Sequence, residues 1–133
     1  MKHVLVVEDD VHNATLFRKV IEKRAGMRVT LCEDGAEILR LTRSGGVDLV
    51  VLDVSLANTA LDGHPVNGVE LCRMLKSDPV TVGVPVMLAT AHAMRGDGER
   101  LMAESGADDY VSKPIIDHAT FAEQAKALLA EAA

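Results

Sequence analysis

Acidic residues end two short apolar runs of this sequence, and their chemistry is the first clue to function. Residues 4–7 lead into Glu8 and Asp9, and residues 49–52 lead into Asp53. Apolar runs of this length between polar residues are typical of strands buried on both faces. The carboxyl ends of parallel strands meet at one edge of a sheet, where open α/β folds place their chemistry. We therefore expect three carboxylates at one edge, and a cation among them, because like charges in one pocket repel each other.

Alternating strand and helix signals could position these acids. Five runs are typical of strands: residues 3–7, 27–31, 48–53, 86–90 and 110–112. Apolar residues recur at helical spacing between them, as at Leu16, Phe17, Val20 and Ile21. Strand and helix alternate five times, which predicts an α/β fold with a doubly wound parallel sheet and helices on both faces.

Turn and capping residues separate these elements. Gly26 is a plausible left-handed stop after the first helix. Asp34 with Glu37 three residues later predicts a capping pair at the second helix, and Asn67 and Asp117 are candidate caps of two later helices. The stretch between Asp53 and Asn67 carries no such signal, so we expect it to be irregular.

Composition limits the class of protein. The 133 residues fit one domain, 1–133, and 48% of them are hydrophobic, which excludes a disordered chain. The net charge of −6 and the lack of a standout basic cluster argue against direct nucleic-acid binding. No apolar run approaches a membrane span and no signal segment opens the chain, so we expect a cytoplasmic protein away from membranes. Cys32 and Cys72 are expected to be buried reduced thiols rather than a disulfide.

Four fragments in this order resemble the receiver domain of two-component response regulators. They are Val6-Val-Glu-Asp9, Leu52-Asp53, Thr90-Ala91 and Tyr110-Val-Ser-Lys113-Pro114. The resemblance covers nearly the whole chain, and its strength lies in the set, since each fragment alone is a weak signal. It implies a flavodoxin-like fold with a five-stranded parallel sheet in the order 2-1-3-4-5, five helices, and a site at the switch point of the sheet.

The resemblance implies that Asp53 is the phosphoacceptor. It also implies a Mg²⁺ site, with Mn²⁺ as an alternative ion, formed by Glu8, Asp9, Asp53 and the backbone carbonyl of Ser55. The acid matching Asp9 ligates directly in the family, and the other usually acts through water. Mg²⁺ suits such a set because it prefers oxygen donors and keeps much of its hydration. The plainer interpretation of Glu8-Asp9-Asp10 is an acidic helix start.

Four further residues match phosphate-binding or switch positions of the family: Thr90, Ala91, Lys113 and Tyr110. Lys113 would pair with the acids and later with the phosphoryl group, and a cis bond to Pro114 would aim it inward. Thr90 would bind a phosphoryl oxygen, and Tyr110 would swing inward as Thr90 moves. The plainer interpretations are a surface lysine, a strand-end threonine satisfied by backbone, and a half-buried strand aromatic.

Two positions are candidates for tuning the lifetime of the phosphoryl group. Ser55 and His92 lie two residues after Asp53 and Thr90, where the family varies and where water reaches the acyl phosphate. We expect them to set the dephosphorylation rate, although His92 could equally be an exposed loop histidine.

The connection after Asp53 departs from the family pattern. Receivers usually reach the glycine that opens the third helix about eight residues after the phosphoacceptor, whereas Gly68 follows Asp53 by fifteen. Asn67-Gly68 is the preferred equivalent because the helix after it is well capped, and Asp62-Gly63 is the alternative. The enlarged loop could be a lid, a partner-recognition patch or slack.

The function implied is that of a stand-alone receiver domain that accepts a phosphoryl group from a sensor histidine kinase or phosphotransfer protein. Its surface near the fourth strand, fourth helix and fifth strand would then change and bind an unknown downstream protein. We expect no DNA-binding or enzymatic output region. We also expect a monomer or weak dimer that is not an enzyme beyond slow self-dephosphorylation.

Other functions use the same fold. A phosphorelay shuttle would hand the phosphoryl group on, and an interaction module could act without phosphorylation. A haloacid-dehalogenase-like phosphohydrolase usually carries a second aspartate two residues after the nucleophile, where this chain has Ser55. A flavin-binding protein would need a phosphate cradle, which the loops do not suggest.

Overall fold

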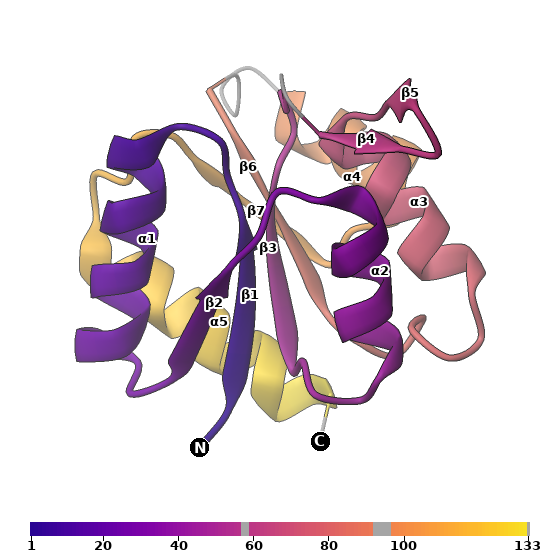
Figure 1. Cartoon of the computed structure of the whole chain (residues 1–133). Helices are drawn as coiled ribbons and strands as arrows, with labels where there is room; N and C mark the ends of the chain where they lie inside the picture. The colour runs from indigo at the N-terminus through magenta and orange to yellow at the C-terminus, as the bar shows by residue number, and fades with distance from the viewer. Residues whose placement is uncertain (57–58, 92–96, 133) are drawn as a thin grey trace.

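The computed structural model of the chain describes residues 1–56, 59–91 and 97–132 (Figure 1). The strands are β1 (His3–Val7), β2 (Arg28–Leu31), β3 (Leu49–Asp53), β4 (Ala60–Leu61), β5 (His64–Pro65), β6 (Val86–Thr90) and β7 (Asp109–Ser112). The helices are α1 (Val11–Arg24), α2 (Gly35–Arg43), α3 (Gly68–Ser77), α4 (Asp97–Ser105) and α5 (His118–Ala132).

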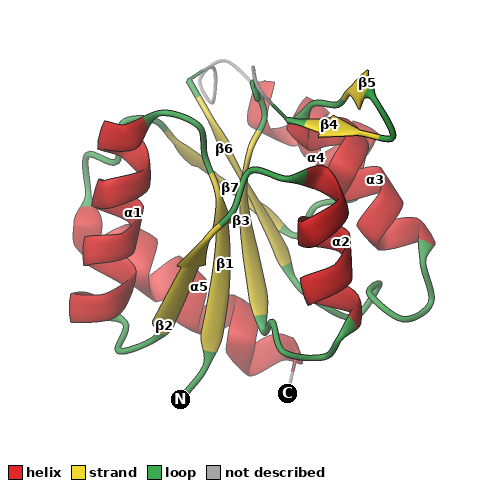
Figure 2. Cartoon of the chain, viewed as in Figure 1, coloured by secondary structure: helices red, strands yellow, loops and turns green. Residues whose placement is uncertain are grey.

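The main sheet has the predicted topology. Its order is β2-β1-β3-β6-β7, and each neighbouring pair is parallel, so the expected order 2-1-3-4-5 is confirmed with β6 and β7 as the fourth and fifth strands (Figure 2). Residues of β3 and β6 are all buried, as expected of strands in the middle of a sheet covered on both faces.

Helices cover both faces of this sheet. Helices α1 and α5 lie on one face, and α2, α3 and α4 lie on the other (Figure 1). Phe17 of α1 meets Phe121 of α5 in the first layer, with ring centroids 5.4 Å apart. Leu71, Cys72 and Leu75 form the inner side of α3 in the second layer. Successive residues of β1 enter different layers, with Val4 and Val6 in the first and Leu5 and Val7 in the second, so one sheet separates two cores.

Local signals locate most helix boundaries. Asn67 accepts from the backbone N–H of Glu70, whose side chain accepts from the N–H of Asn67, and this capping box confirms the preferred start of α3. Asp34 caps α2 through the N–H of Ala36. The predicted capping pair is wrong in its second member, because Glu37 pairs with Arg40 one turn further along.

The stretch after Asp53, predicted to be irregular, contains a β-hairpin, and this is the main correction to the sequence analysis. Strands β4 and β5 pair in antiparallel fashion across a turn in which Asp62 and Gly63 have φ values of 52° and 81°. Two consecutive positive φ values are typical of the type I′ hairpin turn, for which Asp-Gly is a preferred sequence. The sequence carries this hairpin signal at Asp62-Gly63, the pair that is also the alternative start of the third helix.

Two further expectations concern the cysteines and the membrane. Cys72 is buried and Cys32 half-buried, and both are free thiols. Burial raises the pKa of the Cys72 thiol to about 11, which makes it an unreactive core residue. Within the described part of the chain, no helix is both long and apolar enough to cross a membrane.

Candidate functional site

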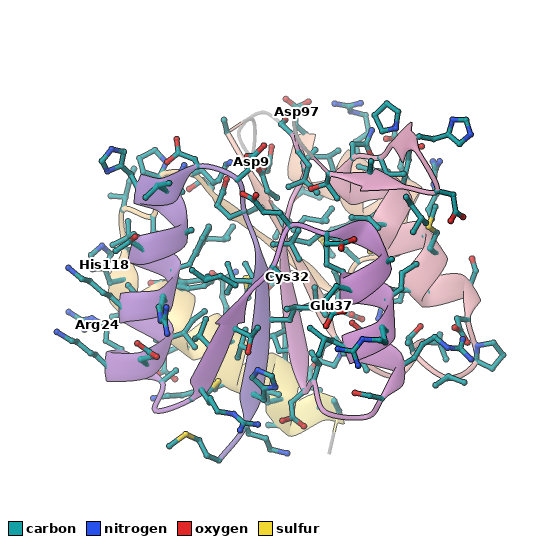
Figure 3. The ribbon with its side chains drawn as sticks, in the orientation of Figure 1. Asp9, Arg24, Cys32, Glu37, Asp97 and His118 are labelled. Carbon is teal, nitrogen blue, oxygen red and sulfur yellow. The ribbon has the colours of Figure 1, made fainter. Side chains whose placement is uncertain are left out.

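Strand register brings the acidic residues to one edge of the sheet. Val7 of β1 pairs with Leu52 of β3, so Glu8 and Asp53 follow at adjacent positions. Both side chains are inside the protein, with 5% of Glu8 and 2% of Asp53 exposed. Asp9 is half-buried and lies at the same end of the molecule as Asp97, the first residue of α4 (Figure 3). The expectation of three acids at one edge is therefore confirmed.

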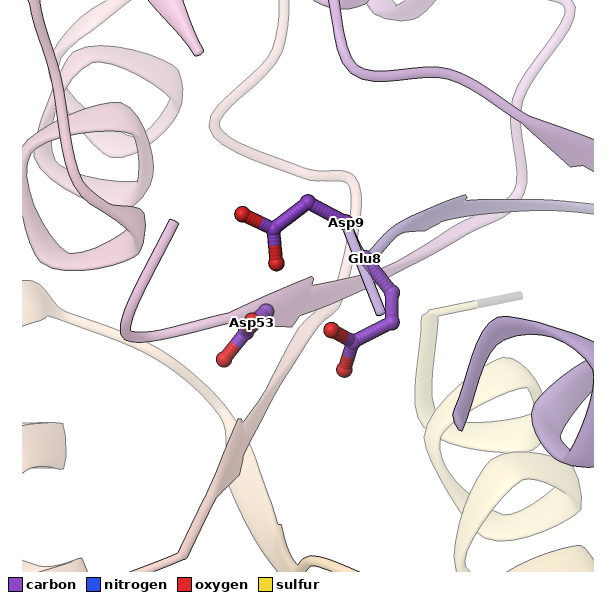
Figure 4. Close-up of side chains that lie close together, drawn as sticks. All are labelled: Glu8, Asp9 and Asp53. Atoms are coloured by element: carbon purple, nitrogen blue, oxygen red, sulfur yellow. The ribbon is translucent and has the colours of Figure 1, made fainter. Parts of the chain in front are cut away.

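The three carboxylates converge on a common space (Figure 4). One oxygen each from Glu8, Asp9 and Asp53 lies within 4.8 Å of the others. Carboxylates at this spacing repel each other, and hard oxygen donors are the ligands that Mg²⁺ and Mn²⁺ accept. The donor set therefore fits a small divalent cation.

Lys113 supplies a positive charge beside two of these acids. Its Nζ lies 2.9 Å from Oδ1 of Asp53 and 3.0 Å from Oε1 of Glu8, and 12% of its side chain is exposed. Its backbone N–H donates to the carbonyl of Thr90 at 2.9 Å, which ties the end of β7 to the end of β6. The peptide bond between Lys113 and Pro114 is cis. The predicted pairing of Lys113 with the acids is present.

The charges of this group do not balance. Burial raises the pKa of Glu8, and the hydrogen bonds from Asp10 N–H and Lys113 only partly offset that effect. Burial alone would lower the pKa of Lys113, but its hydrogen bonds to Asp53 and Glu8 outweigh burial and raise it. Among the described residues, one ammonium thus shares this site with three carboxylates, which leaves an excess of negative charge there.

Backbone groups hold two of the carboxylates in position. The N–H of Ser55 donates to Oδ1 of Asp53 at 3.0 Å, and the N–H of Asp10 donates to Oε2 of Glu8 at 3.1 Å. Gly68 packs so closely that a Cβ there would lie 2.0 Å from the carbonyl oxygen of Asp53. The sequence predicts Gly68 only as a helix start, because this contact joins residues fifteen positions apart and leaves no local pattern.

Thr90 and Ala91 lie at the same edge of the sheet. Asp53 pairs in register with Ala89, so Thr90 is one residue beyond the phosphoacceptor candidate on the neighbouring strand. Thr90 is buried and Ala91 is exposed. His92, the second candidate for tuning, lies outside the described residues.

Tyr110 lies against the first turn of α4. Its hydroxyl donates to Oε1 of Glu99 at 2.9 Å, and this bond is the main reason that the pKa of Tyr110 is raised. A Cβ on Gly98 would lie 2.2 Å from the tyrosine ring, so the ring rests there because residue 98 has no side chain. Sequence reasoning found Tyr110 but missed Gly98 and Glu99, because only the packing of α4 on β7 brings them together.

Comparisons with known proteins agree with this geometry. The sequence pattern of the response regulator receiver domain family matches residues 4–126. The polar-differentiation response regulator DivK of Brucella anthropi is 38% identical over 114 residues, covering 86% of this chain and 85% of that protein. DivK of Brucella ovis matches with the same identity and coverage.

Solved structures share the fold. A putative response regulator from Chloroflexus aurantiacus matches with a TM-score of 0.81 and 26% identity, over 97% of this chain and 98% of that one. The receiver domain of sensor histidine kinase PA1611 from Pseudomonas aeruginosa matches with a TM-score of 0.78 and 25% identity over the same shares. That crystal structure has a magnesium ion coordinated in the active site cleft.

Proposed function

Because this chain belongs to the response regulator receiver domain family, we propose that the carboxylate of Asp53 accepts a phosphoryl group and that the resulting charge switches a binding surface. The observation that carries the proposal is the position of Asp53. Its carboxylate is 2% exposed, lies 2.9 Å from Lys113 and shares a space with two other acids at the end of the central strand.

Phosphoryl transfer to Asp53 requires nucleophilic attack by one carboxylate oxygen on phosphorus. An acyl phosphate forms as the bond from phosphorus to the donor breaks, and the leaving group of the donor takes the bonding electrons. The N–H of Ser55 holds Oδ1 of Asp53, which fixes the direction of the carboxylate. Lys113 lies within reach of the same oxygen and would follow the charge onto the new phosphoryl group.

We assign the metal site to Glu8, Asp9, Asp53 and the backbone carbonyl of Ser55, with Mg²⁺ as the ion and Mn²⁺ as a substitute. The clustered oxygens and the excess negative charge support this choice. A bound divalent ion would neutralise the oxygens of the incoming phosphoryl group. Glu8 also carries the bond to Lys113, so it fixes the ammonium beside Asp53.

The switch would act through Thr90 and Tyr110. A charge-assisted hydrogen bond from Thr90 to a phosphoryl oxygen contributes roughly 1.5–3 kcal/mol, and about 1.4 kcal/mol shifts a two-state equilibrium tenfold. Tyr110 would then leave Glu99 and turn toward the space that Thr90 vacates. The face formed by β6, α4 and β7 would change with it.

The proposed phosphodonor is a sensor histidine kinase or a phosphotransfer protein, and the output is binding to another protein in the cytoplasm. The relatives named DivK are response regulators, which supports this assignment. We further propose that the protein acts as a monomer or weak dimer, does not bind nucleic acid, and turns over no substrate beyond its own phosphoryl group. Ser55 and His92 are the proposed determinants of the lifetime of that group.

Mass spectrometry tests the central step. Incubation with acetyl phosphate or phosphoramidate plus Mg²⁺ should add one phosphoryl group that maps to Asp53, and the Asp53→Asn variant should gain none. Asp62→Asn is a matched control, because Asp62 is an exposed carboxylate on the nearby turn and asparagine tolerates its positive φ. Labelling that persists in Asp53→Asn would overturn the assignment.

A further inference from the structure

The insertion between β3 and α3 (residues 56–67) is the feature that the receiver function leaves unexplained. Its hairpin, β4 and β5, has paired strands and a turn of defined geometry. At its base the N–H of Val66 donates to the carbonyl of Thr59 at 3.1 Å. The described part of the insertion is therefore a folded element and not slack chain.

Both ends of the insertion are fixed next to Asp53. At the start, Ser55 donates its N–H to the Asp53 carboxylate. At the end, Gly68 donates its N–H to the carbonyl of Val54 at 3.1 Å and packs on the Asp53 carbonyl. The hairpin is therefore joined at both ends to residues that contact Asp53 or Val54.

The outer side of the hairpin rests on the start of α2, beside which β4 lies (Figure 1). A Cβ on Gly35 would lie 2.5 Å from the carbonyl oxygen of Ala60 and 3.4 Å from Cβ of Leu61. Leu61 is partly buried against the core that α2 and α3 share. The hairpin can approach α2 this closely only because residue 35 is glycine.

A buried hydroxyl disfavours the position of the hairpin against α2, which we call the docked state. Thr59 is 2% exposed, and its Oγ1 has no hydrogen-bond partner among the described residues. A buried polar group without a partner destabilises the arrangement that buries it. The docked state is thus favoured by close packing at Gly35 and disfavoured at Thr59, so single substitutions can shift it in either direction.

We infer that docking of the hairpin on α2 positions the backbone of Ser55 in the acidic site, with Gly35 and Thr59 as positioning residues. A long loop that carries a ligand at one end samples many conformations unless something fixes it. In this chain the contact of Ala60 with α2, seven residues beyond Asp53, supplies that constraint. The inference rests on the proposed function, because it assigns the insertion a role in the metal and phosphoryl site.

The test compares Gly35→Ala with Thr59→Val. Alanine at position 35 favours helix but displaces the Ala60 carbonyl, so α2 should persist while the hairpin lifts. We expect Mn²⁺ binding, followed by electron paramagnetic resonance with Mg²⁺ competition, to weaken about tenfold. The Ser55 and Val66 amides should exchange faster by NMR, and the Leu71 amide, bonded within the start of α3, should not.

Thr59→Val keeps the shape and removes the unpaired hydroxyl, so slower exchange at Val66 and metal binding at least as tight as in the wild type are expected. Gly83→Ala is the control, because a Cβ there meets no atom within 4 Å. Unchanged metal affinity in Gly35→Ala would overturn the inference, whether or not Val66 exchange accelerates. Failure of the wild type itself to bind Mn²⁺ or Mg²⁺ would instead overturn the proposed function.

Discussion

The two ends of the main sheet differ in how their charged side chains are paired. At the amino end, Lys76 donates to the carbonyls of Val82 and Val84 at 3.2 and 2.9 Å and to Asp108 at 2.8 Å. Asp108 also accepts from the N–H of Val86 at 2.8 Å. The ion pair therefore links α3, the loop before β6 and the residue that precedes β7. At the carboxyl end, the described residues place one lysine beside three carboxylates.

The amino end of these strands therefore contributes to stability, whereas the carboxyl end is suited to chemistry. A polar group whose partners are all supplied by the protein lowers the free energy of the folded state and leaves nothing for a ligand. Carboxylates held close together repel one another, which raises that free energy and favours binding of a cation. Substitutions at the two ends should therefore have opposite effects on stability.

The largest effect on stability is expected at the amino end. Lys76→Met preserves much of the side-chain volume but leaves two backbone carbonyls and Asp108 without their donor. The free energy of unfolding should fall by about 2 kcal/mol, measured by urea denaturation. Phosphorylation of Asp53 by acetyl phosphate should keep its wild-type rate; a loss of phosphorylation in the folded variant would break the proposed separation of the two ends.

A smaller effect of opposite sign is expected at the carboxyl end. In metal-free buffer, Asp53→Asn should raise the free energy of unfolding by about 1 kcal/mol, because the attraction of one ammonium is offset by two carboxylates and the desolvation of Asp53 remains. Asparagine retains Oδ1 as an acceptor for the N–H of Ser55.

Addition of Mg²⁺ gives a second comparison of the wild type with Asp53→Asn. At ten times its dissociation constant, the ion should stabilise the wild type by about 1.4 kcal/mol and the Asp53→Asn variant by much less. Equal stabilisation of both proteins would show that the acid cluster is not the binding site. Urea denaturation with and without the ion gives both values.

The smallest effect is the pH dependence of Glu8. Its pKa is raised by burial in the folded state, so the folded protein binds a proton more readily than the unfolded chain. The metal-free wild type should therefore gain stability as the pH falls from neutral toward 4.5, relative to Glu8→Gln, which lacks this titration. Denaturation curves of both proteins across that range test the sign, and a difference that does not change with pH would contradict it.

Much of the fold could be predicted because its signals are local. Buried strands appear as short apolar runs, and caps such as Asn67 satisfy the backbone groups of the helix beside them. The acids that end two strands were predictable in the same way, since strand ends in a parallel sheet share one edge. The family resemblance added Lys113, whose role no local pattern indicates.

Contacts between distant residues were decided only by tertiary packing. Lys113 reaches Glu8 across 105 positions of the chain, the hairpin meets α2 where Gly35 leaves room for Ala60, and Tyr110 lies on Gly98. A glycine in the sequence says that a side chain is missing but not which neighbour occupies the space. The sequence alone therefore specified the elements and the acidic edge of the sheet. The docking of those elements decided which groups hold the site in place, because close packing depends on surfaces that are assembled only in the folded chain.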